Sequence, residues 1–193
     1  MTVAYRIVYS LGWVLLKFFY PFKIVRSGNV PDGGAIICAN HSHLFDPLFT
    51  AFAFGRNQMI HFMAKSELFK TPILAPILRG VGAFGVDRGQ NDIISVKTAM
   101  KHLKNGKKVM IFPEGTRSSE DNAIEAKLGA VRLASKMNVP IVPVFIPRQK
   151  KLFHTMRIYV GTPYMVEAKT KDEYGLYSEK LMETIARLGD AKL

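Results

Sequence analysis

The sequence is poor in cysteine, in acidic residues and in long apolar runs, and each shortage excludes a class of protein. A single cysteine, Cys38, cannot form an internal disulfide, and it lies in an apolar run that predicts a buried strand, so we expect a reducing, cytoplasmic setting. Asp and Glu number 15 against 27 Lys and Arg, a formal net charge of +12. This excess favours anionic partners such as lipid, phosphorylated metabolites or nucleic acid.

Nucleic acid is the least favoured of these partners. The basic residues are scattered along the chain, and the densest basic patch, residues 148–151, is short. The composition, 48% hydrophobic and 22% charged residues, also excludes a disordered chain and falls short of an all-membrane one. We therefore expect a globular domain with one unusually apolar element and no nucleic-acid partner.

That apolar element is the stretch 7–22, which is shorter than the roughly 20 residues that a bilayer-spanning helix needs. Pro21 stops a helix, and no small-residue cleavage site of a signal peptide follows. Arg6, Ser10 and Lys17 fall near one side of the helix, as in helices that lie in a membrane interface; the alternative is a buried core helix. We expect residues 1–22 to attach the protein, as a peripheral or monotopic protein, to an anionic cell membrane on its cytoplasmic face.

Strand and helix patterns alternate through residues 23–193, which we interpret as one domain. Strands are predicted at 24–26, 35–39, 59–64, 81–86, 108–112, 141–146 and 157–160, and helices at 92–105, 124–137 and 172–188. This order predicts an α/β fold with a mixed, largely parallel sheet flanked by helices, preceded by the N-terminal amphipathic membrane-interface helix.

A histidine and an aspartate directly follow the predicted strand 35–39. His41 stands five residues before Asp46, and Pro47 favours a helix start with Asp46 as its cap. Ligand sites of α/β sheets cluster at the carboxyl ends of strands, and a tight loop here can bring the two side chains into contact. Such a carboxylate orients the imidazole and makes the pair a general base. Taken alone, the spacing equally fits a plain helix cap beside a loop histidine.

Two further blocks each place an arginine just past a predicted strand. Residues 82–88 end in Arg88, and residues 112–118 contain Arg117. Two guanidinium groups at one sheet edge suit a phosphate monoester, because each can donate two charged hydrogen bonds, and Gly115 and Thr116 add backbone and hydroxyl donors. The alternative is a pair of surface arginines that pair with the acidic residue of each block.

Together with the Val-Pro-Ile-Val-Pro-Val run at 139–144, these blocks resemble, in order, the four motifs of the glycerolipid acyltransferase family, specifically its 1-acyl-sn-glycerol-3-phosphate acyltransferases. The resemblance covers roughly residues 26–163. It implies transfer of a fatty acyl group from an acyl thioester, acyl-CoA or acyl carrier protein, to the sn-2 hydroxyl of 1-acyl-sn-glycerol 3-phosphate (lysophosphatidic acid), which gives phosphatidic acid. It implies no metal or other cofactor, since a thioester is already activated.

The resemblance also implies roles for single residues. His41 and Asp46 would be the catalytic pair, and the residues that bind the glycerol phosphate would be Arg88, Glu114, Gly115, Thr116 and Arg117. Lys65 is expected either to donate to the oxyanion of the thioester carbonyl or to be a solvated surface lysine. One departure is Gly85, which stands where the family usually carries a bulky apolar residue, so we expect looser packing beside Arg88.

Other interpretations stay open beside this one. Within the same chemistry, the acceptor can be glycerol 3-phosphate or a lysophospholipid with a larger head group. From another class, the chain can be a non-catalytic lipid-binding membrane protein, although the intact pair of His41 and Asp46 argues against it. A covalent acyl-enzyme through Cys38 or Ser42 is less favoured, because Cys38 is expected to be buried. His41 and His43 lack the further ligands and spacing of a zinc site.

Overall fold

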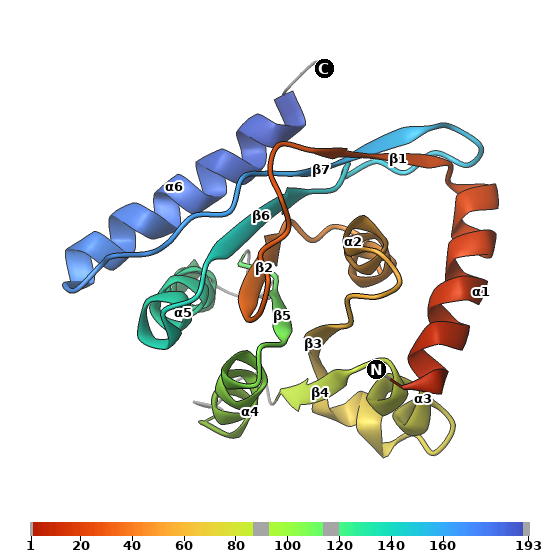
Figure 1. Cartoon of the computed structure of the whole chain (residues 1–193), viewed down its shortest axis with the longest axis horizontal. Helices are drawn as coiled ribbons and strands as arrows, with labels where there is room; N and C mark the ends of the chain where they lie inside the picture. The colour runs from red at the N-terminus through yellow and green to blue at the C-terminus, as the bar shows by residue number, and fades with distance from the viewer. Residues whose placement is uncertain (1, 87–92, 114–119, 191–193) are drawn as a thin grey trace.

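The structure is a computed structural model that describes residues 2–86, 93–113 and 120–190, without the side chains of residues 120–127. These residues build a seven-stranded sheet with the strand order β1-β7-β6-β2-β5-β3-β4 (Figure 1). The strands are β1 (Phe22–Arg26), β2 (Ala35–Ala39), β3 (Ile60–Lys65), β4 (Ala83–Val86), β5 (Lys108–Ile111), β6 (Ile141–Phe145) and β7 (Met156–Val160).

Five neighbouring strands, β6, β2, β5, β3 and β4, run parallel to one another. Their carboxyl ends therefore meet at one edge of the sheet, where ligand sites of such sheets form. Strand β7 runs antiparallel to β6, and β1 pairs parallel with β7. The expectation of a mixed, largely parallel sheet is confirmed.

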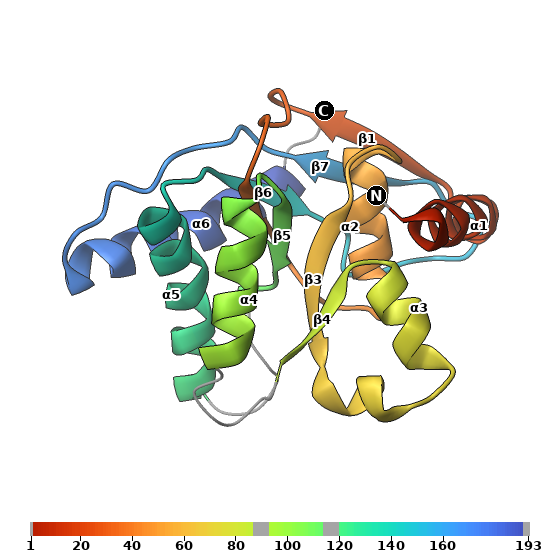
Figure 2. The same ribbon diagram turned by 60° about the horizontal axis from the view of Figure 1, so that its bottom comes forward.

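Helices cover both faces of this sheet, α1, α2 and α3 on one side and α4, α5 and α6 on the other (Figures 1 and 2). The helices are α1 (Val3–Phe19), α2 (Asp46–Phe54), the short 3₁₀ helix η1 (Ser66–Lys70), α3 (Leu74–Gly80), α4 (Ile93–Lys104), α5 (Glu120–Met137) and α6 (Lys171–Asp190). The sheet is thus the middle layer of a three-layer α/β fold.

The central strand β2 shows why the sheet is buried on both faces. All five of its residues are fully buried, with Ile37 facing the hydrophobic core on the α1 and α2 side and Ile36 and Cys38 facing the core on the α4, α5 and α6 side. Alternate residues of a strand point to opposite faces, so a strand between two helical layers has to be apolar throughout. Burial also raises the pKa of the Cys38 thiol, so the thiol stays protonated and uncharged inside the core.

The N-terminal helix α1 has two different apolar faces. Tyr5, Tyr9 and Leu16 are buried in the core, and the ring of Trp13 lies edge-on to Phe52, with centroids 5.3 Å apart. The opposite face carries exposed apolar side chains: Val3, Ile7, Leu11, Val14, Leu15 and Phe18. The helix runs from Val3 to Phe19, so it begins earlier and ends earlier than the predicted stretch 7–22. In the part of the chain that the structure describes, no helix is long and apolar enough to cross a membrane.

Helices η1 and α3 were not predicted from the sequence. Proline residues at 72 and 76 mark the stretch as irregular, but Pro76 lies in the first turn of α3. Proline is tolerated there because the first N–H groups of a helix have no partner within the helix. The expected strand 81–86 is accordingly shorter and begins at Ala83.

Candidate active site

The loop that follows β2 is tied to the end of the neighbouring strand β6. Asn40 is buried, and its side-chain amide donates to the carbonyl of Ile146 and accepts from the N–H of Ile146, both at 2.7 Å. These two bonds fasten the loop 40–46 to the segment that follows β6. The two segments therefore stay side by side at the edge where the parallel strands end.

Asp46 organises the loop around its carboxylate. Its Oδ2 accepts hydrogen bonds of 2.6 Å from the backbone N–H groups of Ser42 and His43, and it lies 3.2 Å from Nδ1 of His41. The carboxylate is fully buried, whereas the His41 side chain is 37% exposed. The structure thus brings together the two side chains that the sequence singled out.

The expected role of Asp46 as a helix cap is wrong. Helix α2 begins at Asp46 itself, its N-cap is Phe45, and this cap makes no side-chain hydrogen bond. The carboxylate points back into the loop, because the N–H groups of Ser42 and His43 bind it there. Asp46 is therefore committed to holding the loop and His41.

A third charged group, Lys150, completes this cluster. Its Nζ lies 2.8 Å from Oδ1 of Asp46, and the exposed fraction of the lysine side chain is only 1%. The ammonium also donates to the carbonyl of Pro147 at 2.8 Å. The sequence interpretation saw Lys150 only as part of a short basic patch. The signal that could have found it is its position after strand β6, which is paired in parallel with β2.

These contacts decide the charge of Asp46. Burial raises the pKa of the carboxyl, but the contacts with His41 and Lys150 and the two backbone N–H groups outweigh it and lower the pKa from 3.8 to about 2. Asp46 is therefore ionised at any pH at which the protein works.

The imidazole of His41 is held on one ring face as well as at Nδ1. The ring of Phe112, directly after β5, stacks on it with centroids 4.2 Å apart and planes 21° apart. Strands β2 and β5 are paired in parallel, so both rings come from the same edge of the sheet. The arrangement fixes the orientation of the imidazole and still leaves part of the side chain accessible from outside.

The residues predicted to bind the glycerol phosphate, Arg88, Glu114, Gly115, Thr116 and Arg117, lie outside the described residues. The strands that precede them, β4 and β5, end at the same edge of the sheet as β2.

Lys65 is the last residue of β3 and ends at this edge too. Its side chain is 53% exposed, and its Nζ lies 4.0 Å from Oε1 of Glu67. A pair with this exposure is weak. The geometry leaves both expectations for Lys65 open, an oxyanion donor and a solvated surface lysine.

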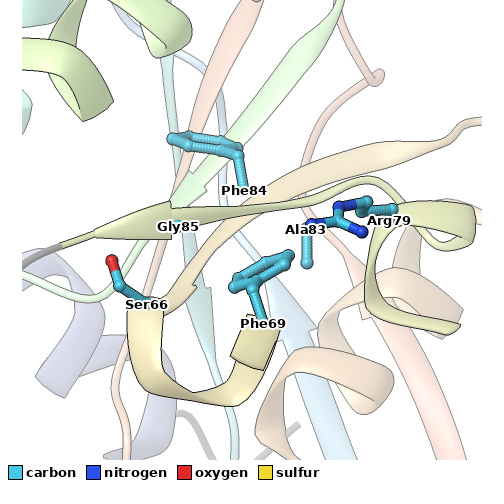
Figure 3. Close-up of a pocket in the computed structure, with 6 residues that line it drawn as sticks. All are labelled: Ser66, Phe69, Arg79, Ala83, Phe84 and Gly85. Atoms are coloured by element: carbon cyan, nitrogen blue, oxygen red, sulfur yellow. The ribbon is translucent and has the colours of Figure 1, made fainter. Parts of the chain in front are cut away.

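A cavity of about 360 Å³ lies against the edge strand β4 (Figure 3). Its lining consists of Ser66, Phe69, Arg79, Ala83, Phe84 and Gly85. A Cβ atom added at Gly85 would lie 3.2 Å from Oγ of Ser66 and 3.7 Å from the ring of Phe69. A bulky side chain at this position would therefore press on η1, and glycine lets η1 approach the strand.

A family model described as Acyltransferase matches residues 22–147, which include β2, the loop 40–46 and Phe112. The chain belongs to the acyltransferase family. The matched region ends at residue 147, before Lys150, whose ammonium contacts Oδ1 of Asp46.

Individual relatives agree with the family. The chain is 34% identical over 185 residues to a 1-acyl-sn-glycerol-3-phosphate acyltransferase of Bacillus subtilis. The aligned region covers 91% of the chain and 92% of that protein. It is 38% identical over 114 residues to the enzyme of the same name from Streptococcus pneumoniae, over 58% of the chain and 41% of the relative. The resemblance seen in the sequence motifs is confirmed.

A solved structure shares the fold. The crystal structure of the 1-acyl-sn-glycerophosphate (LPA) acyltransferase from Thermotoga maritima superimposes with a TM-score of 0.65 at 24% identity, over 97% of this chain and 78% of that one. The present chain and the Thermotoga maritima protein therefore share the arrangement of sheet and helices.

Proposed function

We propose that this acyltransferase moves a fatty acyl group from an acyl thioester to the sn-2 hydroxyl of 1-acyl-sn-glycerol 3-phosphate, which gives phosphatidic acid. The observation that carries the proposal is the pair of His41 and Asp46, 3.2 Å apart, with an accessible imidazole at the carboxyl edge of the sheet. The names of the relatives from Bacillus subtilis and Streptococcus pneumoniae support the choice of acceptor.

His41 acts as the general base in this reaction. An ionised Asp46 accepts a hydrogen bond from Nδ1–H, so the other ring nitrogen takes the proton from the acceptor hydroxyl. The hydroxyl oxygen attacks the carbonyl carbon of the thioester, the carbon–sulfur bond breaks, and the imidazolium returns its proton to the leaving thiolate. General base catalysis of this kind contributes about 10²–10⁴-fold to the rate.

The acceptor is recognised by its phosphate. Arg88 and Arg117 are proposed to donate to this phosphate, together with the backbone of Gly115 and the hydroxyl of Thr116. Glu114 is proposed to bind the glycerol phosphate as well, as a hydrogen-bond acceptor. Lys65 is a candidate donor to the oxyanion. The acyl donor is acyl-CoA or acyl carrier protein. The mechanism calls for no metal, since the thioester is already activated.

The exposed apolar face of α1 supports attachment to the membrane that holds the acceptor. Phe153, from the segment between β6 and β7, extends this face: its N–H donates to the carbonyl of Phe19 at 2.7 Å, and its ring lies 5.8 Å from that of Phe18. Phe18 and Phe153 are 65% and 62% exposed. We propose that this surface lies in the cytoplasmic leaflet of the cell membrane as a peripheral or monotopic attachment.

The basic residues near α1 divide into two kinds. Lys17 donates to the carbonyl of Phe22, and Arg26 donates to the carbonyl of Ala53, so both are engaged within the protein. Arg6 of α1 and Lys23 of β1 are exposed and are the better candidates for contact with anionic lipid.

His41→Ala tests the function directly. Wild type and variant would be incubated with acyl-CoA or acylated acyl carrier protein, and with lysophosphatidic acid, glycerol 3-phosphate or lysophosphatidylcholine as acceptor. The products would be identified by mass spectrometry. We expect phosphatidic acid from the wild type and a loss of at least about 10²-fold in the variant. Preference for another acceptor would correct the substrate, and a His41→Ala protein as active as the wild type would remove His41 from the chemistry.

A further inference from the structure

Lys150 is the buried charged group at the active site that none of the sequence motifs contains. Its ammonium and the carboxylate of Asp46 have exposed side-chain fractions of 1% and 0%, and 2.8 Å separates Nζ from Oδ1. The two oxygens of Asp46 therefore have different tasks: Oδ1 faces Lys150, and Oδ2 faces His41 and the loop.

The fold holds Lys150 in this place. The paired hydrogen bonds between Asn40 and Ile146 bring the end of β6 to the loop. In the segment that follows Ile146, the ammonium of Lys150 donates to the carbonyl of Pro147 at 2.8 Å and lies 3.4 Å from Oγ of Ser42. A lysine held by its own segment and by the loop has a fixed direction, unlike a flexible surface lysine.

We propose that Lys150 is a positioning residue for acyl transfer: its ammonium anchors Oδ1 of Asp46 and thereby turns Oδ2 toward His41. This inference rests on the proposed function, in which His41 is the base.

The ammonium matters because the carboxylate of Asp46 is fully buried. With Oδ1 held by Lys150, Oδ2 accepts from the loop N–H groups and faces Nδ1 of His41. Without the ammonium, the carboxylate would be a buried charge that has lost its counter-charge, which is costly. It would turn or move toward other partners, and His41 would lose the group that orients it.

The first test compares Lys150→Met with Lys150→Arg. Methionine keeps the length and removes the charge, so Asp46 should lose its anchor and kcat should fall about 10–100-fold, while the KM for the acceptor changes little. Lys150→Arg keeps the cation and should restore most of kcat, which a loss caused only by poor packing would not predict.

Lys151→Met is the matched control. The neighbouring lysine is exposed, and its removal changes the net charge by the same amount. Its kcat should equal that of the wild type. A control that loses as much activity as Lys150→Met would show that the net charge of the enzyme, and not the contact with Asp46, causes the loss.

A double-mutant cycle separates positioning from a structural role. If Lys150 acts through Asp46, then Lys150→Met should cost little further activity once Asp46→Asn is in place, because the contact has already lost its charge. The double variant also leaves no unpaired buried charge, so it keeps the test informative if Lys150→Met alone folds poorly. Thermal melts at pH 7 would follow folding.

Two outcomes would overturn the inference. One is a rate loss in Lys150→Met that adds fully to that of Asp46→Asn and that Lys150→Arg does not restore, as expected of a structural role. The other is a wild-type kcat for Lys150→Met. Either result together with an inactive His41→Ala leaves the proposed function intact and removes only Lys150, whereas an active His41→Ala removes both.

Discussion

Phe112 and His41 stack ring on ring, 4.2 Å between centroids, and each follows the end of its own strand. Phe112 is the first residue after β5 and His41 the second after β2, so two neighbouring parallel strands place an aromatic face beside the base. The imidazole is thereby held in the plane in which Nδ1 faces Asp46.

Phe112→Leu should leave His41 in place but make the orientation of its imidazole ring less fixed. Ring contacts of this kind are worth about 0.5–1.5 kcal/mol, so kcat should fall roughly 2–10-fold. Phe112→Tyr keeps the ring and serves as the control. Steady-state kinetics with saturating donor would measure the effect, and a leucine variant with unchanged kcat would show that Asp46 alone orients the ring.

Asp46 should make the stability of the protein depend on pH. Its pKa is lowered from 3.8 to about 2 in the folded state, so its contribution is fully present above pH 4 and is lost as the pH falls through 2. The size of this contribution is about 2 kcal/mol. Denaturant titrations at pH 7, 4 and 2 should show the gap in unfolding free energy between wild type and Asp46→Asn shrinking at the lowest pH. A constant gap would mean that the carboxylate charge does not contribute.

Trp13→Ser should lower the stability of the protein and Phe18→Ser its binding to membranes, because the two rings lie on different faces of α1. Trp13 packs on Phe22 and Phe52, so its loss should lower stability by about 3–5 kcal/mol. Phe18 is exposed, so its loss should weaken co-sedimentation with anionic liposomes and leave the melting temperature nearly unchanged. Liposome binding by Phe18→Ser equal to that of the wild type would place the membrane surface elsewhere.

Arg117→Lys should raise the KM for a phosphorylated acceptor, since an ammonium cannot replace the two parallel hydrogen bonds of a guanidinium on phosphate. Arg88→Lys should act in the same direction. The comparison acceptor is a monoacylglycerol, which lacks the phosphate and should be used with the same KM by wild type and variants. Equal losses on both acceptors would exclude these arginines from phosphate recognition.

The sequence was informative where one local pattern decides the outcome. The all-apolar run 35–39 predicts a strand covered on both faces, and the structure has that strand, with the polar residues that follow it at the carboxyl edge of the parallel strands. This position favoured a contact between His41 and Asp46, but the spacing alone equally fitted a helix cap beside a loop histidine, and the structure decides for the contact.

Other features depend on contacts that no local pattern records. Lys150 is 104 positions from Asp46, and it reaches the carboxylate only because β6 lies next to β2. Likewise, both faces of α1 are apolar in the sequence, and only the packing of Phe22 and Phe52 determines that Trp13 points inward. Helix α3 was missed because two prolines suggest an irregular segment unless one of them is placed in a first turn.

The short stretch from Lys150 to Phe153 joins the buried carboxylate to the exposed ring beside α1. Three residues of extended chain span at most about 11 Å, so the backbone that carries Lys150 lies within that distance of the backbone that carries the exposed ring. If Phe153 rests in the lipid, the acceptor can react at the depth where its glycerol already lies, without being pulled out of the bilayer. The rate would then follow the mole fraction of acceptor in the membrane surface, and adding inert lipid at constant total acceptor should slow the enzyme.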